Sequence, residues 1–498
     1  MTPTQAFRRY CDHFIAGDAA AIASMFTDDG EFIVPMADKP AKGRASIEKE
    51  MRQAALSQKN IQVEVTAAID AGATGFVEAN YSAEVVGTGG KLDGTPHRVD
   101  FRMVGEITLV DGKIKRLTEY LDRRPMFPEE RQRVFTVNRL SPYFGKSVEE
   151  GCMEWMVYNN MHFPMIYGRM PFQEYDTLLN GVTLWDVGLE RQTQLKGPDA
   201  LRFMDYLSCR DMSAMKVGQC RYTLLTDENG ICLCDPVVLR PSEDTIWISH
   251  GNTDITLWAR GIVMGSDWKV EVSEPDIAPM QIQGPLSIEV MKAICADPVW
   301  ELKNYTCMRT TVLGKDVVVS RTGWSSGEGF EIYPLSSVGA TDIWDAVKKA
   351  GEPYDIMVMG PNIFRALERG VTDISYYTNS GMNALEDLGN KFVHLDVEAD
   401  FIGKDALKRI RADGVRRKSV GLFIEGPVPR MEWFWDAKDA RGNPGVVRWA
   451  AHSFALDRSL GIALVDASVE VGDVIEVSHP LGVVKAEVTT VPFVGKSS

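Results

Sequence analysis

The sequence predicts an α+β protein with an N-terminal cone, a larger α+β unit of several parts and a C-terminal β-barrel. Three observations lead to this fold class. In the first 125 residues, helical patterns come first and a long series of strand patterns follows. Further along, helical and strand-like stretches alternate, and after Lys418 the pattern is entirely β. A chain of 498 residues is also too long for one hydrophobic core.

The first unit is predicted to begin with helices and to continue as an antiparallel meander. Helical apolar spacing covers Thr4–Ala16, and a second helix covers Ala19–Phe26 and ends at the turn signal Thr27–Gly30. The remaining predicted elements are a strand at Glu31–Pro35, a helix at Gly43–Leu56 and strands at Ile61–Ile69, Thr74–Val86, His97–Val110 and Ile114–Asp122. This order indicates a curved sheet wrapped around a helical lid.

The larger unit mixes helices and strands before its β-rich end. Helices are predicted at Asp199–Leu207, Pro285–Ala296 and Ala340–Ala350, and strands at Tyr222–Leu225, Thr245–Ser249 and Val317–Val319. The run Arg-Arg-Pro-Met-Phe-Pro at 123–128 has the composition of a linker. We therefore expect a cone at 1–125, a linker at 126–142, a mixed domain at 143–415 and a barrel at 416–498.

Composition excludes several classes of function. The formal net charge of −15 argues against a nucleic acid or an anionic membrane as the partner. No apolar stretch approaches the length that spans a bilayer, and the N-terminus lacks an apolar signal core, so we expect a cytoplasmic protein. The 8 cysteines lack disulfide-framework spacing and the 7 histidines lack metal-ligand spacing, so no metal is expected.

The most informative stretch runs from Ser320 to Tyr333 as a Gly-rich loop between two strand-like segments. Glycines at 323, 327 and 329 predict positive φ angles and a close approach of a flat ligand to the backbone. Trp324 offers an aromatic face, and Glu331 offers a carboxylate. Together they suit a heterocycle with paired N–H donors, such as a pterin. The residues taken alone favour another interpretation, a hairpin that has a long turn.

Four motifs of the larger unit resemble the folate-binding aminomethyltransferase family, which includes the glycine-cleavage T-protein. They are Gly218–Gly230, Gln283-Gly284-Pro285, Arg321–Ile332 and Phe401–Leu407, in the family's order. The third motif departs from the family pattern at Ser326 and Gly327. The resemblance implies tetrahydrofolate as the cofactor, with Glu331 as the pterin-binding carboxylate and Trp324, Arg321 and Asn362 as further cofactor-binding residues.

Within that family the chain is similar to the demethylases. The form Asp235-Pro236-Val237 and the pair Pro361-Asn362 match folate-dependent demethylases of sulfonium compounds and methoxylated aromatics. Ala366 stands where the glycine-cleavage enzymes usually have an arginine. The resemblance therefore implies demethylation of a small methoxylated, lignin-derived aromatic substrate.

The first unit resembles the SnoaL-like, nuclear-transport-factor-2-like cones. The residues that carry this resemblance are Phe26–Gly30, Gly43–Ile47 and Asp111–Ile114, which leads into Glu119–Asp122. Such cones serve as enzymes, binding pockets or dimerisation modules. We expect a homo-oligomer, without a stated number of subunits.

The candidate catalytic residues follow from the demands of removing a methyl group from an aryl ether. Asp235 is the candidate polar anchor near the reacting nitrogen, and it is otherwise a turn former. A departing phenolate needs a donor, for which Tyr222, Tyr376 and Tyr377 are candidates because one phenol matches the pKa of another. The other interpretation of these tyrosines is packing in a sheet or core. His250 could face the same cleft or be a structural histidine.

Two other functions remain open from the sequence. A formaldehyde lyase would release formaldehyde from a hydroxymethyl group of a lignin-derived aromatic dimer without folate, using a general base. A folate-binding scaffold would have no catalytic activity, and its cone would form a dimer interface.

Overall fold

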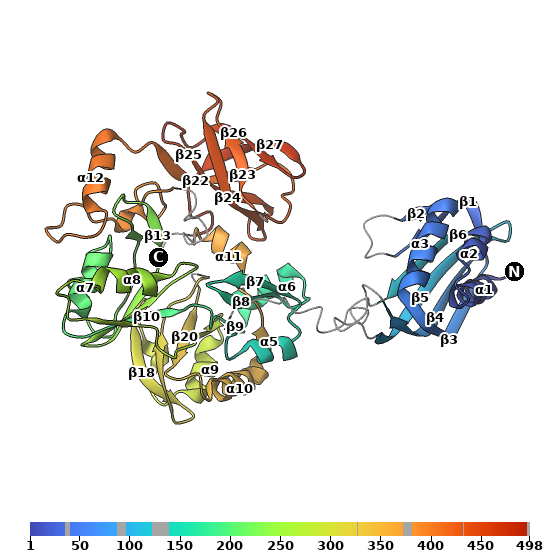
Figure 1. The fold of residues 1–498 in the computed structure, drawn as a ribbon, viewed down its shortest axis with the longest axis horizontal. Helices are drawn as coiled ribbons and strands as arrows, with labels where there is room; N and C mark the ends of the chain where they lie inside the picture. The colour runs from blue at the N-terminus through green and yellow to red at the C-terminus, as the bar shows by residue number, and fades with distance from the viewer. Residues whose placement is uncertain are drawn as a thin grey trace. The chain divides into compact units, whose positions relative to one another are not determined.

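The computed structural model describes residues 1–34, 40–86, 96–121, 139–325, 327–371, 381–431 and 433–495. The chain forms two compact units that divide between Leu121 and Arg139 (Figure 1). Most of the expected linker, residues 126–138, lies outside the described residues. The described helices include none that is both long enough and apolar enough to cross a membrane.

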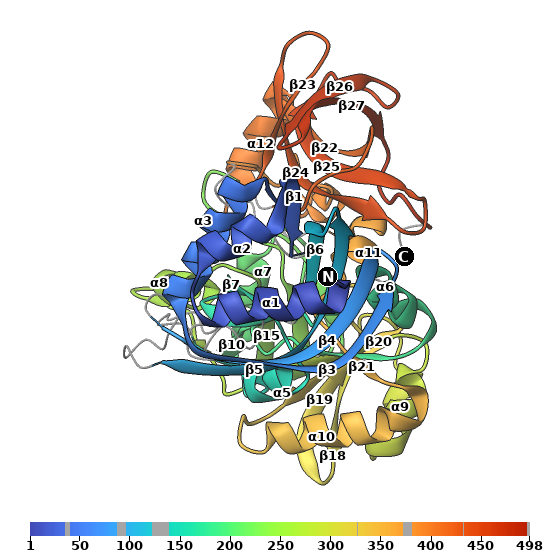
Figure 2. The same ribbon diagram turned by 90° about the vertical axis from the view of Figure 1, so that its right-hand side faces the viewer.

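The first unit is a curved six-stranded sheet with three helices on its concave side, as predicted (Figures 1 and 2). The strand order is β2-β1-β6-β5-β4-β3. The helices are α1 (Pro3–Ile15), α2 (Ala19–Met25) and α3 (Arg44–Ser57). The strands are β1 (Phe26–Ile33), β2 (Ala41–Lys42), β3 (Gln58–Ala71), β4 (Thr74–Val85), β5 (His97–Val110) and β6 (Lys113–Leu121).

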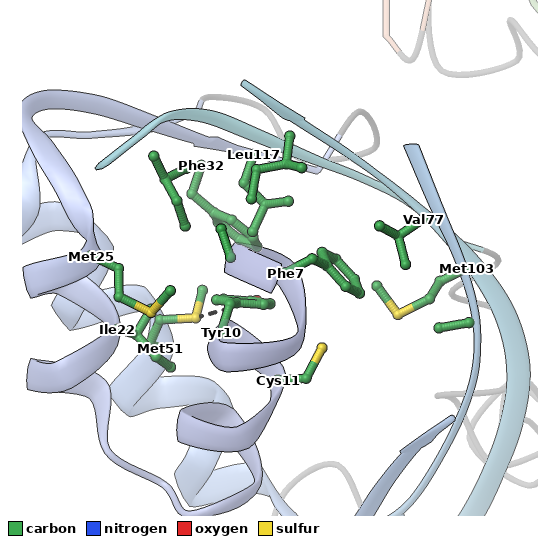
Figure 3. Close-up of a cluster of buried hydrophobic side chains, with 14 of the residues drawn as sticks. Phe7, Tyr10, Cys11, Ile22, Met25, Phe32, Met51, Val77, Met103 and Leu117 are labelled. Carbon is green, nitrogen blue, oxygen red and sulfur yellow. Dashed lines mark hydrogen bonds between the residues drawn. The ribbon is translucent and has the colours of Figure 1, made fainter. Parts of the chain in front are cut away.

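Helix α1 fills the concave side because its apolar face matches the inward face of the sheet. Figure 3 shows Phe7 of α1 beside Val77 and Met103 of the sheet. A side chain at Gly105 of β5 would overlap the Phe7 ring, so glycine is needed for α1 to approach this closely. The helix begins at Thr2, whose side chain accepts a hydrogen bond from the backbone of Gln5.

The predicted turn at Thr27–Gly30 is wrong, because these residues belong to strand β1. β1 pairs in parallel with β6, and the register shifts between Phe26 and Glu31. Asp28 and Asp29 are exposed and form ion pairs with Arg44 and Lys115 respectively. Their turn-like composition therefore reflects an irregular strand with paired acidic side chains rather than a chain reversal.

The second unit contains two larger sheets and a closed barrel. The five-stranded sheet has the order β11-β14-β15-β10-β16, and the six-stranded sheet has the order β18-β19-β20-β17-β9-β21. The strands of the two sheets are β9 (Thr183–Asp186), β10 (Gln192–Lys196), β11 (Cys220–Tyr222), β14 (Val237–Ser242), β15 (Thr245–Ser249), β16 (Glu271–Ser273), β17 (Met280–Gln283), β18 (Cys307–Val312), β19 (Lys315–Ser320), β20 (Gly329–Pro334) and β21 (Met357–Val358). Two short hairpins are β7 (Glu154–Tyr158) with β8 (Met161–Ile166), and β12 (Leu225–Thr226) with β13 (Cys232–Cys234).

Helices cover one face of the six-stranded sheet. The helices of this unit are α5 (Phe144–Glu149), α6 (Pro171–Asn180), α7 (Ala200–Leu207), α8 (Ile255–Val263), α9 (Ser287–Ile294), α10 (Ala340–Gly351), α11 (Ile363–Glu368) and α12 (Lys404–Asp413). Val290 of α9 and Trp344 of α10 pack in one buried cluster with Ile282 and Ile332 of the sheet. The main core of the sheet therefore lies on this side, and its other face carries smaller buried clusters together with polar residues.

The C-terminal barrel is confirmed. Its six strands close in the order β22-β25-β24-β23-β26-β27 (Figures 1 and 2). They are β22 (Arg417–Ile424), β23 (Trp435–Lys438), β24 (Pro444–Ser453), β25 (Arg458–Asp466), β26 (Val474–His479) and β27 (Gly482–Thr489). Alternating buried and exposed positions, clearest in β26, account for its β pattern.

The cone contains a carboxylate on its apolar inner face. Glu119 of β6 lies opposite Gly105 of β5, which shares the inward face. Tyr10 of α1 forms a hydrogen bond with this carboxylate. Burial raises the pKa of Glu119 to about 7, and the Tyr10 hydrogen bond opposes that rise only in part.

We expect the cone to lose stability as the pH rises from about 4.3, the ordinary pKa of a glutamate, to about 7. The folded state holds this proton more tightly than the unfolded state, so protonation favours folding. The loss should be about 1–2 kcal/mol, reduced from the full linkage value because Glu119 is only half-buried.

Hydrogen exchange of β4–β6 amides in the full chain at several pH values measures this effect. Glu119→Gln should flatten the dependence over that range. An unchanged pH dependence in the variant would contradict the assignment.

Candidate active site

One polar row crosses four strands of the six-stranded sheet on the face opposite α9 and α10. The paired residues are Ser320 of β19, Glu331 of β20, Gln281 of β17 and Trp185 of β9. Most of their sequence neighbours point into the core on the other side, because side chains alternate along a strand. The row therefore forms because successive side chains of each strand point to opposite faces of the sheet, and both faces are buried.

Glu331 is held by hydroxyl groups that all donate to the same oxygen. Tyr333 donates to Oε2 at 2.8 Å, Ser320 donates at 3.3 Å, and Thr322 donates to it as well. The residue is 6% exposed. Burial raises the pKa of Glu331, and these three hydroxyl groups oppose the rise. The carboxylate is thus preorganised through Oε2, and none of these donors occupies Oε1.

Two glutamine amides lie beneath the Gly-rich loop. The Gln283 amide nitrogen donates to the carbonyl oxygens of Gly327 at 3.3 Å and Glu328 at 2.9 Å. Side chains at Gly323 or Gly329 would overlap these glutamine amides. The expected positive φ at the loop glycines is wrong, since none of the three adopts it. The glycines instead allow the loop backbone to pack on the protein's own amides.

A second polar cluster contains Tyr222 and Asp235. The Tyr222 hydroxyl donates to Asp235 Oδ2 at 3.0 Å. Burial, the charge of Asp235 and that of Asp387 raise the pKa of Tyr222 well above its ordinary value. Tyr222 therefore keeps its proton and orients Asp235, and its expected role as an acid stays a prediction.

Strand β11 links the two clusters. Cys220 packs in one buried cluster with Tyr333, whose hydroxyl donates to Glu331. Cys220 and Tyr222 are two residues apart on one strand, so their side chains share a face about 7 Å apart. Strand β11 therefore contributes Cys220 to the cluster beside Glu331 and Tyr222 to the cluster of Asp235.

Trp324 of the loop stacks on Trp449 of the barrel. Their ring centroids are 5.6 Å apart and their planes make an angle of 19°. Trp449 follows a register shift in β24, between Val447 and Trp449. One face of Trp324 is therefore covered by the barrel, which ties the loop to the C-terminal part of the unit.

Arg321 and Asn362 make contacts that hold local structure. The Arg321 guanidinium donates to the backbone carbonyls of Trp300 at 3.2 Å and Leu302 at 2.9 Å, and it pairs with Glu328. Asn362 is buried and caps α11 by accepting from the Arg365 backbone at 2.9 Å. Their expected contact with a cofactor stays a prediction.

His250 is buried directly after β15, and its Nδ1 lies 3.1 Å from the Gly251 carbonyl oxygen. Burial lowers the pKa of His250 to about 4, so the ring is neutral near pH 7 and has no proton to give as an imidazolium acid. Tyr376 and Tyr377 lie outside the described residues.

Sequence reasoning missed several members of the site. They are Gln281, Ser320, Thr322, Tyr333 and Trp449. The pattern Gln-x-Gln at 281–283 inside a buried strand was an available signal, since two polar residues two positions apart share a face. No local signal identifies Trp449, because it reaches the loop from a distant strand.

The described residues hold no group of His, Cys, Asp and Glu side chains that could bind a metal. An open cavity of about 920 Å³ lies beside α6, lined by Arg169, Phe172, Tyr175, Met357 and Phe454 among others. Met357 is on the edge strand β21, three strands from β20, or about 14 Å. This cavity is therefore separate from Glu331 and lies near the Trp185 end of the sheet.

Comparisons with known proteins agree with this architecture. Residues 147–387 match the family model of the GCVT N-terminal domain, and residues 7–117 match that of the SnoaL-like domain. The chain is 31% identical over 332 residues to the dimethylsulfoniopropionate demethylase DmdA of Ruegeria pomeroyi, covering 66% of this chain and 90% of that protein. It is 30% identical over 330 residues to an aminomethyltransferase of Bacillus pumilus, covering 64% of this chain and 89% of that protein.

A solved structure shows the same fold. The second unit matches the glycine cleavage system aminomethyltransferase T of Bartonella henselae with a TM-score of 0.63 and 21% identity, over 72% of this chain and 98% of that one. The similarity confirms the fold expected for the larger unit.

Gly329→Ala should lower the free energy of unfolding by about 1–3 kcal/mol, because its Cβ displaces the Gln283 amide from the loop. Urea denaturation of the full chain measures this. Gly327→Ala is the matched control, since its Cβ would meet only Ser325 Oγ at 3.4 Å, and it should change stability by less than about 0.5 kcal/mol. Equal effects of the two substitutions would contradict the packing account.

Proposed function

Because the chain belongs to the GCVT aminomethyltransferase family, we propose that it is a tetrahydrofolate-dependent demethylase of a small substrate. Members of this family are tetrahydrofolate-dependent one-carbon transferases. The similarity to a demethylase and the Asp235-Pro236-Val237 form favour methyl transfer over aminomethyl transfer.

The observation that carries the proposal is the pair of acceptors at the centre of the polar row. Glu331 is fixed through Oε2, and Gln281, directly opposite on β17, has a buried Oε1 without a hydrogen-bond partner among the described residues. A reduced pteridine presents two adjacent N–H donors along one edge. The residues present therefore fit this group, since among the described residues Gln281 Oε1 has no donor and the three hydroxyl donors to Glu331 all use Oε2.

The chain's own residues would bind and orient the reactants. Glu331 would accept N–H donors, and Asp235, oriented by Tyr222, would lie toward the reacting end. The stacked Trp324 and Trp449 would limit access of water to the loop. When bound, tetrahydrofolate supplies the nucleophilic nitrogen that takes the methyl group. Positioning of the two reactants can account for several kcal/mol of the barrier reduction.

A methoxylated aromatic compound stays our first proposed substrate, with the sulfonium class as its competitor. Its departing phenolate needs a proton donor. The Tyr222 hydroxyl already donates to Asp235, and the His250 ring is neutral near pH 7, so we propose a different donor for the phenolate. Tyr376 and Tyr377 remain the candidate donors.

Glu331→Gln should weaken tetrahydrofolate binding by about 10-fold to 100-fold, because a charge-assisted hydrogen bond is replaced by a neutral one. In the wild type, affinity should also fall as the pH falls toward the raised pKa of Glu331, where the carboxylate becomes protonated. Titration calorimetry at several pH values measures both effects. Glu289→Gln on the exposed surface of α9 is the matched control and should bind like the wild type.

Turnover of a methoxylated aromatic acid and of a sulfonium compound, each with and without tetrahydrofolate, tests the reaction class. We expect loss of the methyl group only when the folate is present, with one methylated folate formed per demethylated product. Folate-independent release of formaldehyde from a hydroxymethylated aromatic dimer would favour the lyase instead. Folate binding without turnover of any substrate would favour the scaffold.

A further inference from the structure

Gln281 carries a buried acceptor that the fold leaves without a donor. The residue is fully buried on β17, and its Nε2 donates to Gln283 Oε1. Its own Oε1 is buried and has no hydrogen-bond partner in the part of the chain that the structure describes. A buried acceptor in this state destabilises the folded protein, so its retention needs a reason.

The orientation of the Gln281 amide follows from its neighbours. Gln283 must point its Nε2 at the carbonyl oxygens of Gly327 and Glu328, because carbonyls only accept. This turns Gln283 Oε1 toward Gln281, which must then present its own Nε2. A flipped Gln281 amide would bring two oxygens together. The oxygen without a donor is therefore Oε1, set by a chain of hydrogen bonds that begins at the loop backbone.

The position of this oxygen places it beside the Glu331 carboxylate. Gln281 and Glu331 are directly opposite in the antiparallel pair, where side chains lie about 5 Å apart on one face. On the other side, Trp185 donates its indole N–H to Thr183 at 2.8 Å, so that donor is already used. Two acceptor groups thus stand side by side at the centre of the row.

We propose that Gln281 is a specificity-determining residue that accepts the amino N–H on the pteridine edge, while Glu331 accepts the adjacent ring N–H. The inference rests on the proposed function and adds the ligand feature that the site recognises. A neutral amide suits this position because it adds an acceptor without a second negative charge beside Glu331. The site therefore selects a ligand edge with paired donors and rejects one with a single donor.

A comparison of two ligands with two proteins tests this directly. Full-length wild type and Gln281→Met are titrated with tetrahydrofolate and with its 2-deamino analogue, which lacks the amino group. We expect the wild type to bind the analogue about tenfold more weakly than tetrahydrofolate, as for one lost hydrogen bond. Gln281→Met should bind tetrahydrofolate about tenfold more weakly and discriminate between the two ligands by less than about threefold.

The outcomes separate this inference from the proposed function. Wild-type binding of tetrahydrofolate with no discrimination against the analogue overturns the role of Gln281 and leaves the folate site standing. Full discrimination in Gln281→Met overturns it as well. No wild-type affinity for tetrahydrofolate overturns both proposals. If Gln281→Met does not fold, the comparison of ligands with the wild type still tests the inference, and it is extended to a 2-dimethylamino analogue, which lacks the amino N–H donors but keeps the ring N–H.

Discussion

The site depends on the antiparallel register between β17 and β20. This register sets Gln281 opposite Glu331, and a shift of β17 by one residue would turn Gln281 into the core beneath α9 and α10. The apolar residues that alternate with them make such a shift costly. The same hydrophobic packing that stabilises the sheet therefore also fixes two acceptor groups on its opposite face. The alternation of side chains along these strands therefore produces both the core on one face and the candidate site on the other.

The Gly-rich loop is the second constraint, and it acts through backbone contact. Gly323 and Gly329 let the loop rest on the glutamine amides, and Gln283 binds the loop carbonyls in return. Trp324 then stacks on Trp449 of the barrel. The Gln283 amide and the Trp449 indole both contact the loop, and these contacts can keep Thr322 in place to donate to Glu331. Rigidity of this kind lets a buried carboxylate stay oriented before a ligand arrives.

The sequence predicted the parts whose signals are local or shared with a family. Helix and strand patterns were sufficient for the cone, and the motif around Glu331 was sufficient to identify the central carboxylate. Gln281 and Trp449 were not found, because their importance comes from strand pairing and from the packing of a distant barrel. The prediction of a turn at Thr27–Gly30 was wrong, because these residues belong to an irregular strand whose acidic side chains form ion pairs. The positive φ angles predicted for the loop glycines were wrong, because these glycines are needed for close packing of the loop on the glutamine amides.

The central claim is that the polar row binds the donor edge of a reduced pteridine. A crystal structure of the full chain with tetrahydrofolate tests it most directly. The account predicts that the pteridine N–H groups lie within hydrogen-bond distance of Glu331 Oε1 and Gln281 Oε1, with the reacting nitrogen toward Asp235. A pteridine bound elsewhere, or bound with its donor edge turned away from these two oxygens, would contradict it.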